Sequence, residues 1–269
     1  MSTILERIFE VKRTRVDTAK RATDLSRFAA AAREARENAV PHRFRRSIET
    51  LGRVNVIAEF KRASPSKGII NRNADPPGAA RAYEAAGAAA ISVLTEEDHF
   101  RGSLDDLRAV RQTVELPILR KDFIFDEYQI YESAISGADA ILLIAASLNV
   151  DEIRRLHSIA EGELGMDALV EVHTKEEMEV AKRCGASLIG VNNRDLKTFD
   201  VSLDVSRELM LVAPAGATLV AESGLRTRQD IDQLLQVGYT AFLIGETLMR
   251  SDDVESALRD LLETESVRG

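Results

Sequence analysis

The sequence contains a single cysteine, and this scarcity excludes two kinds of site. With only Cys184 available, the chain cannot form an intrachain disulfide or a zinc site built on several cysteines. Cys184 ends a helical stretch before a predicted strand, where a buried and inert thiol is the expected role. The four histidines lack the spacing of metal ligands, so no metal site is predicted.

Long apolar runs and an excess of positive charge are also missing. No uninterrupted apolar stretch approaches the ~18 residues that a membrane span needs, and the charged first twenty residues do not resemble a signal peptide. The net charge is -8 and the pI is about 5.2. A protein that binds nucleic acid or an anionic membrane would show the opposite balance. We therefore expect a cytoplasmic protein with neither partner, in which local basic clusters can still bind small anions.

What the chain has is a regular alternation of short apolar runs and helical stretches. Of its 269 residues 45% are hydrophobic, which is enough for a sizeable core. Capping residues begin several helical stretches, for example Ser103 and Thr174, and Gly87 and Gly185 end two of them. The predicted strands are Val54–Phe60, Ala88–Thr95, Leu116–Phe123, Ala140–Ala145, Ala168–His173, Leu188–Asn193, Thr218–Ser223 and Ala241–Glu246.

Eight such strands, each followed by a helix, predict a closed (β/α)8 TIM barrel. The alternative, an open doubly wound sheet, is disfavoured because no strand is followed by a Rossmann glycine fingerprint. The six prolines cluster nowhere as a linker. We predict one α/β domain over residues 1–269, with the barrel at 51–269 and a helical extension at 1–50. We expect the extension to pack on the barrel and the loops near residues 45–51 to roof its mouth.

Charged residues stand at the carboxyl ends of the predicted strands, which meet at the mouth of a barrel. Glu59 and Lys61 share one side of the first strand, Lys121 ends the third, and Glu171 shares a side with His173 at the end of the fifth. If these sides face inward, two lysines and two glutamates converge into an acid–base set with coupled pKa values. The alternatives are structural ion pairs that cap the barrel and, for His173, a place in the core or behind the site.

The last two predicted strands end in a small residue next to a glycine. Ser223–Gly224 follows the seventh strand, and Gly245–Glu246 ends the eighth. In barrel enzymes, backbone N–H groups at these two strand ends commonly hold a phosphate. The alternative is a pair of simple tight turns.

Six sequence strings, taken in order, resemble the indole-3-glycerol-phosphate synthase family of tryptophan biosynthesis. They are IAEFKRASPSKG, LRKDF, VEVH, GVNNRDLKTF, VAESG and FLIGETLM, and the likeness covers about residues 1–260. The resemblance implies a (β/α)8 fold and the substrate 1-(2-carboxyphenylamino)-1-deoxyribulose 5-phosphate. That substrate undergoes ring closure, loss of carbon dioxide and loss of water, without a cofactor.

The resemblance also implies roles for particular residues. Lys121 is implied as the general acid and Glu171 as the general base, with Glu59, Lys61 and Asn192 completing the catalytic set. The implied substrate-binding residues are Ser64, Arg194, Ser223, Gly224, Gly245 and Glu246. Glu246 departs from the serine of many relatives, and because its carboxylate would repel a phosphate, only its backbone N–H is assigned to binding.

Three other functions stay open at this stage. A phosphoribosylanthranilate isomerase would need a cysteine or aspartate acid–base pair at the mouth, and Cys184 lies before a strand, at the wrong end. A Schiff-base aldolase would use Lys61 or Lys121 as a nucleophile. A non-catalytic barrel could bind a phosphorylated metabolite as a sensor. For the protein itself we expect a small phosphorylated substrate and a monomer or weak oligomer.

Overall fold

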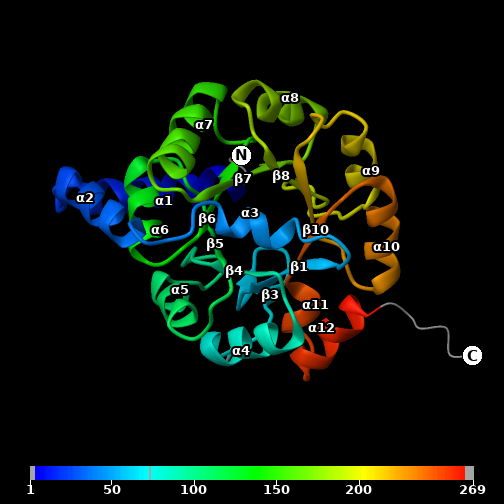
Figure 1. Ribbon diagram of the computed structural model, residues 1–269. Helices are drawn as coiled ribbons and strands as arrows, with labels where there is room; N and C mark the ends of the chain where they lie inside the picture. The colour runs from blue at the N-terminus through cyan, green and yellow to red at the C-terminus, as the bar shows by residue number, and fades with distance from the viewer. Residues whose placement is uncertain (1–3, 73, 264–269) are drawn as a thin grey trace, which may run out of the picture.

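The computed structural model describes residues 4–72 and 74–263, and its strands close into a barrel (Figure 1). Eight parallel strands pair in the order β1-β10-β9-β8-β7-β6-β5-β4, and β4 pairs back with β1. The predicted (β/α)8 fold is therefore confirmed. The barrel strands are β1 (Asn55–Phe60), β4 (Ala90–Leu94), β5 (Ile118–Lys121), β6 (Ala140–Ile144), β7 (Asp167–Val172), β8 (Leu188–Asn192), β9 (Thr218–Glu222) and β10 (Ala241–Ile244).

Helices surround the barrel, and their ends follow the local signals of the sequence. The hydroxyl of Thr174 accepts a hydrogen bond from the backbone N–H of Glu177, and Gly185 ends the same helix with a φ of 78°. The outer helices are α4 (Pro76–Ala86), α5 (Leu104–Arg111), α6 (Glu127–Ile135), α7 (Val150–His157), α8 (Lys175–Cys184), α9 (Asp204–Met210), α10 (Arg228–Val237), α11 (Glu246–Met249) and α12 (Val254–Leu262). A short π-helix, Ser158–Glu163, continues α7.

The apolar core has two layers, because each strand alternates between the barrel interior and the helices. On β1, Val56, Ala58 and Phe60 pack in the large outer layer beneath the helices. Ile57, between them in the sequence, packs with Leu119 and Leu169 in the smaller inner layer. Because Glu59 follows Ile57 by two residues, it points into the barrel as well.

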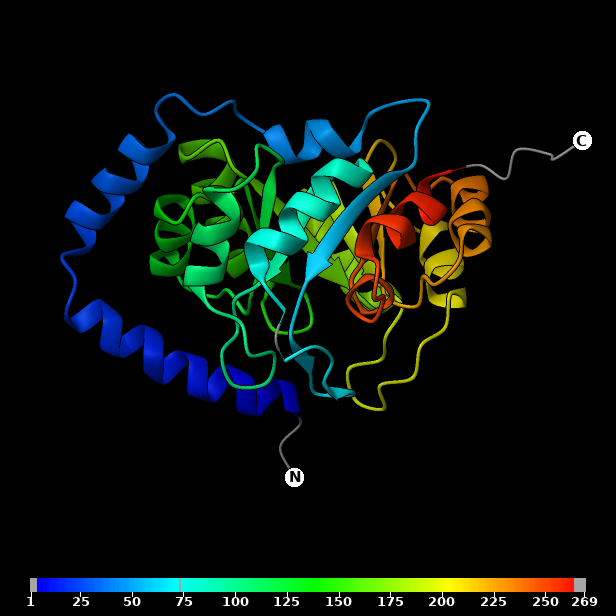
Figure 2. The same cartoon turned by 90° about the horizontal axis from the view of Figure 1, so that it is seen from below.

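The N-terminal extension forms three helices that reach from one end of the barrel to the other. They are α1 (Ile4–Arg21), α2 (Leu25–Arg36) and α3 (Arg43–Ile48). Figure 2 shows α1 and α3 at opposite ends of the barrel, with α2 along its side. The ring of Phe28 on α2 stacks on that of Tyr128 on α6, with 4.9 Å between the ring centroids. Among the described residues, no helix is long and apolar enough to cross a membrane.

The prediction that residues 45–51 roof the mouth is wrong. The side chains of Phe44 and Ile48, one helical turn apart on α3, are fully buried in the inner apolar layer at the floor, the end where the strands begin. The backbone N–H of Arg45 donates to the carboxylate of Asp167, the first residue of β7, at 2.9 Å. The apolar face of α3 fits the open bottom of the barrel, and α1 lies at the mouth instead.

One small element of the mouth was not predicted from the sequence. Residues after β1 form a two-stranded hairpin, β2 (Ala63–Ser64) and β3 (Gly68–Ile69). Each strand has two residues, which is too short to leave a periodic pattern. The hairpin brings Ser64 and the loop up to Lys67 over the strand ends.

Candidate active site

A cavity of about 730 Å³ opens at the carboxyl ends of the strands. Its wall includes every residue that the sequence predicted for the site, together with Ile4, Leu5 and Ile8 of α1. The predicted residues gathered there are Glu59, Lys61, Ser64, Lys121, Glu171, Asn192, Arg194, Ser223, Gly224, Gly245 and Glu246. The structure thus brings together side chains that are spread over nearly the whole chain.

Lys121 lies at the centre of the charged group. Its Nζ atom is 3.0 Å from Oε2 of Glu171 and 2.5 Å from Oε2 of Glu222. The side chains of Glu171 and Glu222 are 4% and 2% exposed, so this ion pair network is almost fully withdrawn from water. Together with Glu59, these residues come from the alternate strands β1, β5, β7 and β9, which in a barrel contribute the inward side chains of one layer.

Glu222 is the residue that the sequence prediction of the site missed. It is the last residue of β9, directly before Ser223, and a carboxylate at the end of an apolar strand was the available signal. The parity rule that pairs β5 with β7 also reaches β9, and would have found it. Its Oε1 atom is buried with no hydrogen-bond partner among the residues that the structure describes. That oxygen lies against Gly190, where a Cβ atom would collide with it.

The structure gives the signs of the pKa shifts in this group. Burial alone would lower the pKa of Lys121, but the charges of Glu171 and Glu222 outweigh it and raise that pKa. Burial would raise the pKa of Glu171, but Lys121 and His173 hold it below its usual range. For Glu222, burial and the nearby Glu171 charge prevail over Lys121 and raise the pKa to about 7. Of the two glutamates, Glu222 is therefore the one that takes up a proton first as the pH falls.

A second lysine–glutamate pair lies beside this group. Nζ of Lys61 is 2.5 Å from Oε1 of Glu59, whose side chain is 4% exposed. Gly245 on the neighbouring strand end leaves room for the pair, because a Cβ atom there would lie 3.0 Å from Lys61 Nζ and would collide with Glu59 Oε1. A bulky residue at position 245 would therefore disturb this pair as well as any ligand at the strand ends.

The predicted phosphate end of the cavity has strained backbone and several cations. Ser223 and Gly224 adopt positive φ angles of 65° and 82°. The carboxylate of Glu246 turns toward cations: its oxygens lie 3.1 Å from Arg250, 3.5 Å from Arg194 and 3.9 Å from Lys67. The side chain of Glu246 thus neutralises part of the positive charge at this end of the cavity.

Arg194 connects the loop after β8 to the hairpin after β1. Its Nη1 atom donates to Oγ of Ser66 at 3.2 Å, and its backbone N–H donates to Oδ1 of Asn192 at 3.1 Å. Asn192 is thereby held with its side chain at the cavity wall. Ser64 lies on the same hairpin as Ser66, also at that wall.

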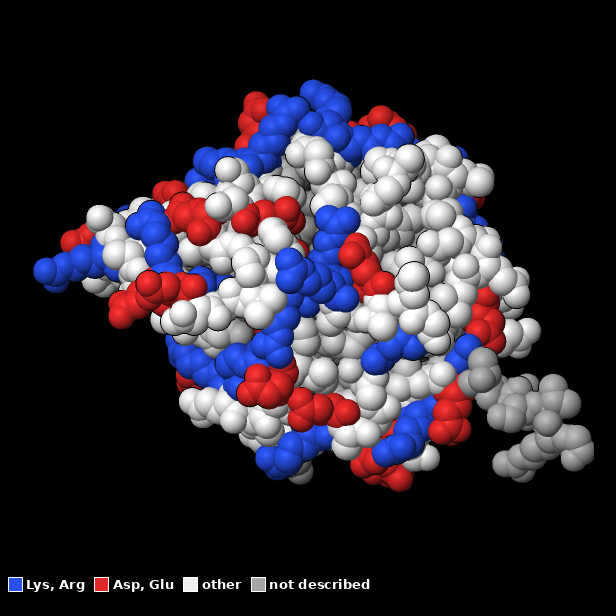
Figure 3. Space-filling view, viewed as in Figure 1, with Lys and Arg blue, Asp and Glu red and all other residues white. Residues whose placement is uncertain are grey.

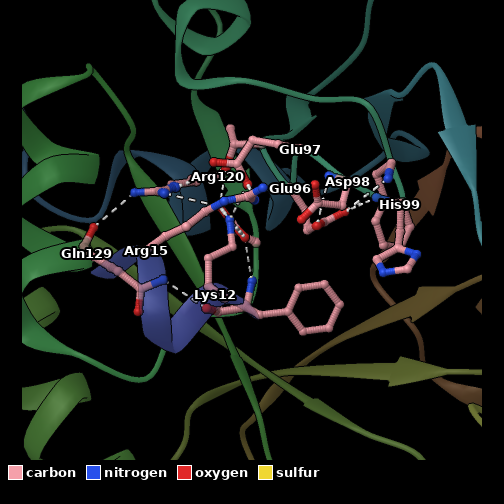
Figure 4. Close-up of polar contacts among 12 residues, drawn as sticks. Lys12, Arg15, Glu96, Glu97, Asp98, His99, Arg120 and Gln129 are labelled. Atoms are coloured by element: carbon pink, nitrogen blue, oxygen red, sulfur yellow. Dashed lines mark hydrogen bonds and ion pairs between the residues drawn. The ribbon is translucent and has the colours of Figure 1, made fainter. Parts of the chain in front are cut away.

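Helix α1 is fastened over the mouth by ion pairs that the sequence prediction did not include. Nζ of Lys12 is 2.8 Å from Glu97 and 2.9 Å from Asp122, and only 5% of its side chain is exposed. Figure 4 shows Lys12 and Arg15 of α1 reaching the loop that carries Glu97 and Asp98. Burial would raise the pKa of Asp122, but Arg120 and Lys12 lower it to about 2. Since Asp122 directly follows Lys121, these contacts couple α1 to the strand end with the central lysine.

The closed barrel of parallel strands makes this a TIM-barrel protein. Its titratable residues lie at the carboxyl ends of the strands, where TIM-barrel enzymes have their active sites. Comparison with known families gives the particular one. Residues 5–261 match the family described as "Indole-3-glycerol phosphate synthase". The chain belongs to the indole-3-glycerol phosphate synthase family, as its sequence strings predicted.

Similar proteins agree with this membership. The chain is 48% identical over 262 residues to an indole-3-glycerol phosphate synthase of Carboxydothermus hydrogenoformans, a match that covers 96% of this chain and 99% of that protein. It is 46% identical over 264 residues to that of Neisseria meningitidis, covering 97% and 100% of the two chains.

Solved structures that are similar at low identity show the barrel fold alone. Thiamine phosphate pyrophosphorylase from Pyrococcus furiosus matches with a TM-score of 0.57 at 17% identity, covering 77% of this chain and 93% of that one. The 3-hexulose-6-phosphate synthase of Salmonella typhimurium matches with a TM-score of 0.58 at 13% identity, covering 77% and 96%.

Proposed function

We propose that this chain converts 1-(2-carboxyphenylamino)-1-deoxy-D-ribulose 5-phosphate into indole-3-glycerol phosphate, as a carboxy-lyase of tryptophan biosynthesis. The observation that supports this most is the position of Lys121, between two buried glutamates in the wall of a cavity. The reaction needs a proton donor and a proton acceptor within one pocket, and this group offers both.

Ring closure is the first step. The aromatic carbon that bears the carboxylate attacks the ketone carbon of the sugar chain, a carbon–carbon bond forms, and the ketone oxygen takes up a proton. Lys121 is the proposed donor, because its ammonium group is held protonated by Glu171 and Glu222. The aromatic ring supplies the electron pair of the new bond. The lone pair of the substrate nitrogen moves toward the ring in its place, so the nitrogen becomes positively charged.

Decarboxylation follows and restores the aromatic ring. The bond between the ring and the carboxylate breaks, and its electron pair neutralises the positive nitrogen system, so no cofactor is needed as an electron sink. Lys61 is the proposed cation that holds the carboxylate before it leaves, with Glu59 at 2.5 Å keeping its ammonium in place. Asn192 is proposed to orient the substrate from the neighbouring wall.

Dehydration completes the reaction. The hydroxyl that formed on ring closure leaves as water after it takes up a proton, and the adjacent carbon loses a proton to a base. Glu171 is the proposed base, since Lys121 and His173 keep it ionised. Glu222, with a pKa raised to about 7, is proposed as a further proton donor in this step.

Substrate binding is proposed for the other end of the cavity. Ser64, Arg194, Ser223 and Gly224 would surround the phosphate, and Gly245 and Glu246 would offer backbone N–H groups. Because α1 contributes to the wall, we also propose that residues 1–269 act as one domain.

Of the rival functions, two are disfavoured by particular contacts. A Schiff-base aldolase needs a neutral lysine, whereas the two glutamates raise the pKa of Lys121. An isomerase that uses a cysteine finds its only candidate, Cys184, at the end of α8, with its thiol donating to the carbonyl of Ala181.

The experiment that tests the proposal is a fluorescence assay for indole-3-glycerol phosphate with the purified chain and the proposed substrate. Formation of product and release of one carbon dioxide per product are expected. A chain that binds the substrate without turnover would instead be the sensor, and an adduct trapped on lysine by borohydride would indicate the aldolase.

A further inference from the structure

His173 lies directly behind the proposed base, held by Glu177 on one side and within ion-pair distance of Glu171 on the other. Its Nδ1 atom is 3.0 Å from Oε2 of Glu177, on the first turn of α8, and its backbone N–H donates to the same oxygen at 2.7 Å. Its Nε2 atom is 3.4 Å from Oε1 of Glu171, which is within ion-pair distance, but this nitrogen makes no hydrogen bond among the residues that the structure describes. The side chain is 9% exposed. The imidazole ring therefore forms a bridge from Glu177, outside the cavity, to Glu171, inside it.

The two glutamates that share Lys121 have unequal surroundings because of this bridge. Glu171 meets Lys121 on one carboxylate oxygen and His173 on the other. Glu222 meets Lys121 on Oε2, while its Oε1 atom lies against the bare backbone of Gly190 and has no hydrogen-bond partner within residues 4–72 and 74–263. Nearby cations favour the ionised form of a carboxylate, so the carboxylate with fewer cations around it is protonated more easily. That carboxylate is Glu222.

We propose that His173 is a positioning residue that keeps Glu171 ionised and leaves Glu222 as the glutamate that takes up a proton first, so that it decides which of the two glutamates acts as the base. This assignment of roles rests on the proposed function. It gives a physical reason for two like side chains, both buried beside one lysine, to do different chemistry.

The charges around His173 agree with this role. Burial would lower the pKa of His173, but Glu171 and Glu177 raise it to about 10, so the ring is an imidazolium at neutral pH. Other charged groups face His173 across a second cavity of about 810 Å³. They are Glu6, Glu10 and Arg13 of α1, and Arg194, Asp195, Lys197 and Asp200 after β8. These groups include both acidic and basic side chains, and a cavity separates them from His173. Glu171 and Glu177, the two nearest acids, therefore have the largest effect on the charge of His173.

The test is the pH dependence of kcat/KM in the variant His173→Gln. The glutamine removes the positive charge and keeps an N–H donor, so Glu171 should take up a proton more readily. An opposite charge at this distance lowers the pKa of a carboxylate by about 1–3 units. The acid limb, the part of the profile where kcat/KM falls as Glu171 becomes protonated, should therefore move to higher pH by about that amount. A lower kcat with an unmoved acid limb would mean a merely structural role and would overturn the proposal.

A matched control is His157→Gln. His157 also faces a glutamate four residues later, with its Nε2 atom 3.3 Å from Glu161, but this pair lies on α7 and the π-helix, outside the cavity. The acid limb of the kcat/KM profile should lie at the same pH in His157→Gln as in the unchanged chain. An equal shift in the control would overturn the proposal, because the effect would not then come from Glu171.

Two further measurements keep the proposal testable if His173→Gln folds poorly. Glu177→Gln removes the carboxylate that holds the imidazolium, and should move the acid limb in the same direction by a smaller amount.

¹³C NMR of protein labelled at glutamate carboxyl groups, with Glu171→Gln for assignment, follows the titration without substrate. Glu171 should titrate below Glu222, and the reverse order would overturn the proposal. A chain without synthase activity but with the expected NMR order would refute the proposed function and leave this order in place.

Discussion

Strand β7 carries a buried acid next to a histidine at each of its two ends, and the two pairs differ in almost everything else. At the floor, Asp167 is 3.0 Å from Nδ1 of His42 and accepts the backbone N–H of Arg45. Phe44 and Ile48 of α3 belong to the inner apolar layer at this end. At the mouth, Glu171 meets Lys121 and His173, faces a second glutamate and borders a cavity.

The difference appears in the pKa values of the two acids. Burial raises the pKa of Asp167 even though hydrogen bonds from the α3 segment oppose it. At Glu171 the lysine and the histidine reverse the effect of burial. Figure 3 shows the floor from outside, where basic side chains gather over α3 with acidic side chains beside them. A buried acid is thus no active site by itself; the site arises where several charges share a space that a ligand can enter.

The largest effect is expected from removing the central charge at the mouth. Lys121→Ala should lower kcat by at least about 10²–10⁴-fold, because general acid catalysis is worth about that much. Lys121→Arg should not restore it, since the larger planar guanidinium does not match the place of the ammonium between the two buried glutamates. Steady-state kinetics with the proposed substrate would measure both. Asp167→Asn is the matching change at the floor and should leave kcat unchanged. An equal loss of kcat in the two variants would contradict the view that only the mouth is an active site.

The next effect concerns stability and belongs to the floor. Phe44 is fully buried in the inner apolar layer, and Phe44→Ala should lower the free energy of unfolding by about 3–5 kcal/mol. Denaturant titration would measure the loss, and kcat at low temperature should change little. A large fall in kcat in the folded variant would show that the floor shapes the mouth.

A moderate effect is expected from pH. When Glu222 ionises near pH 7, Lys121 faces a second full negative charge, its pKa rises further, and it becomes a weaker acid. We therefore expect kcat/KM to fall as pH rises through about 7, and to fall on the acid side where Glu171 becomes protonated, below the usual range of a glutamate. In Glu222→Gln the fall near pH 7 should vanish. If it persists there, another group titrates.

The smallest effect is expected at the rim of the mouth. Glu246 is partly exposed and pairs with Arg194 and Arg250. Exposed ion pairs are worth at most about 1 kcal/mol, so Glu246→Ser should free Arg194 for the phosphate and lower KM by up to about five-fold, with kcat unchanged. The exposed Glu115, which lies 3.8 Å from Arg43 beside the floor helix, provides a control, since Glu115→Ser should leave KM as it is. A higher KM in Glu246→Ser would mean that this side chain helps to hold the ligand.

The sequence alone determined the barrel and most of its mouth. Strands and helices differ in the period of their apolar residues, and caps and glycines mark their ends, so local patterns suffice for the eight units. The charges of Lys121 and Glu171 could be placed at the mouth because all parallel strand ends meet there. The resemblance to a known family added Asn192, Ser64 and Arg194, which also line the cavity.

Only the tertiary structure decided which extension helix covers which end, and how the charges at the mouth share their protons. The fit of Phe44 and Ile48 into the floor depends on the shape of the closed barrel, which no local pattern describes. The unequal surroundings of Glu171 and Glu222 depend on His173 and on the missing side chain of Gly190. Burial and Coulomb interactions act over distances in space, and folding brings these groups together from positions far apart in the chain.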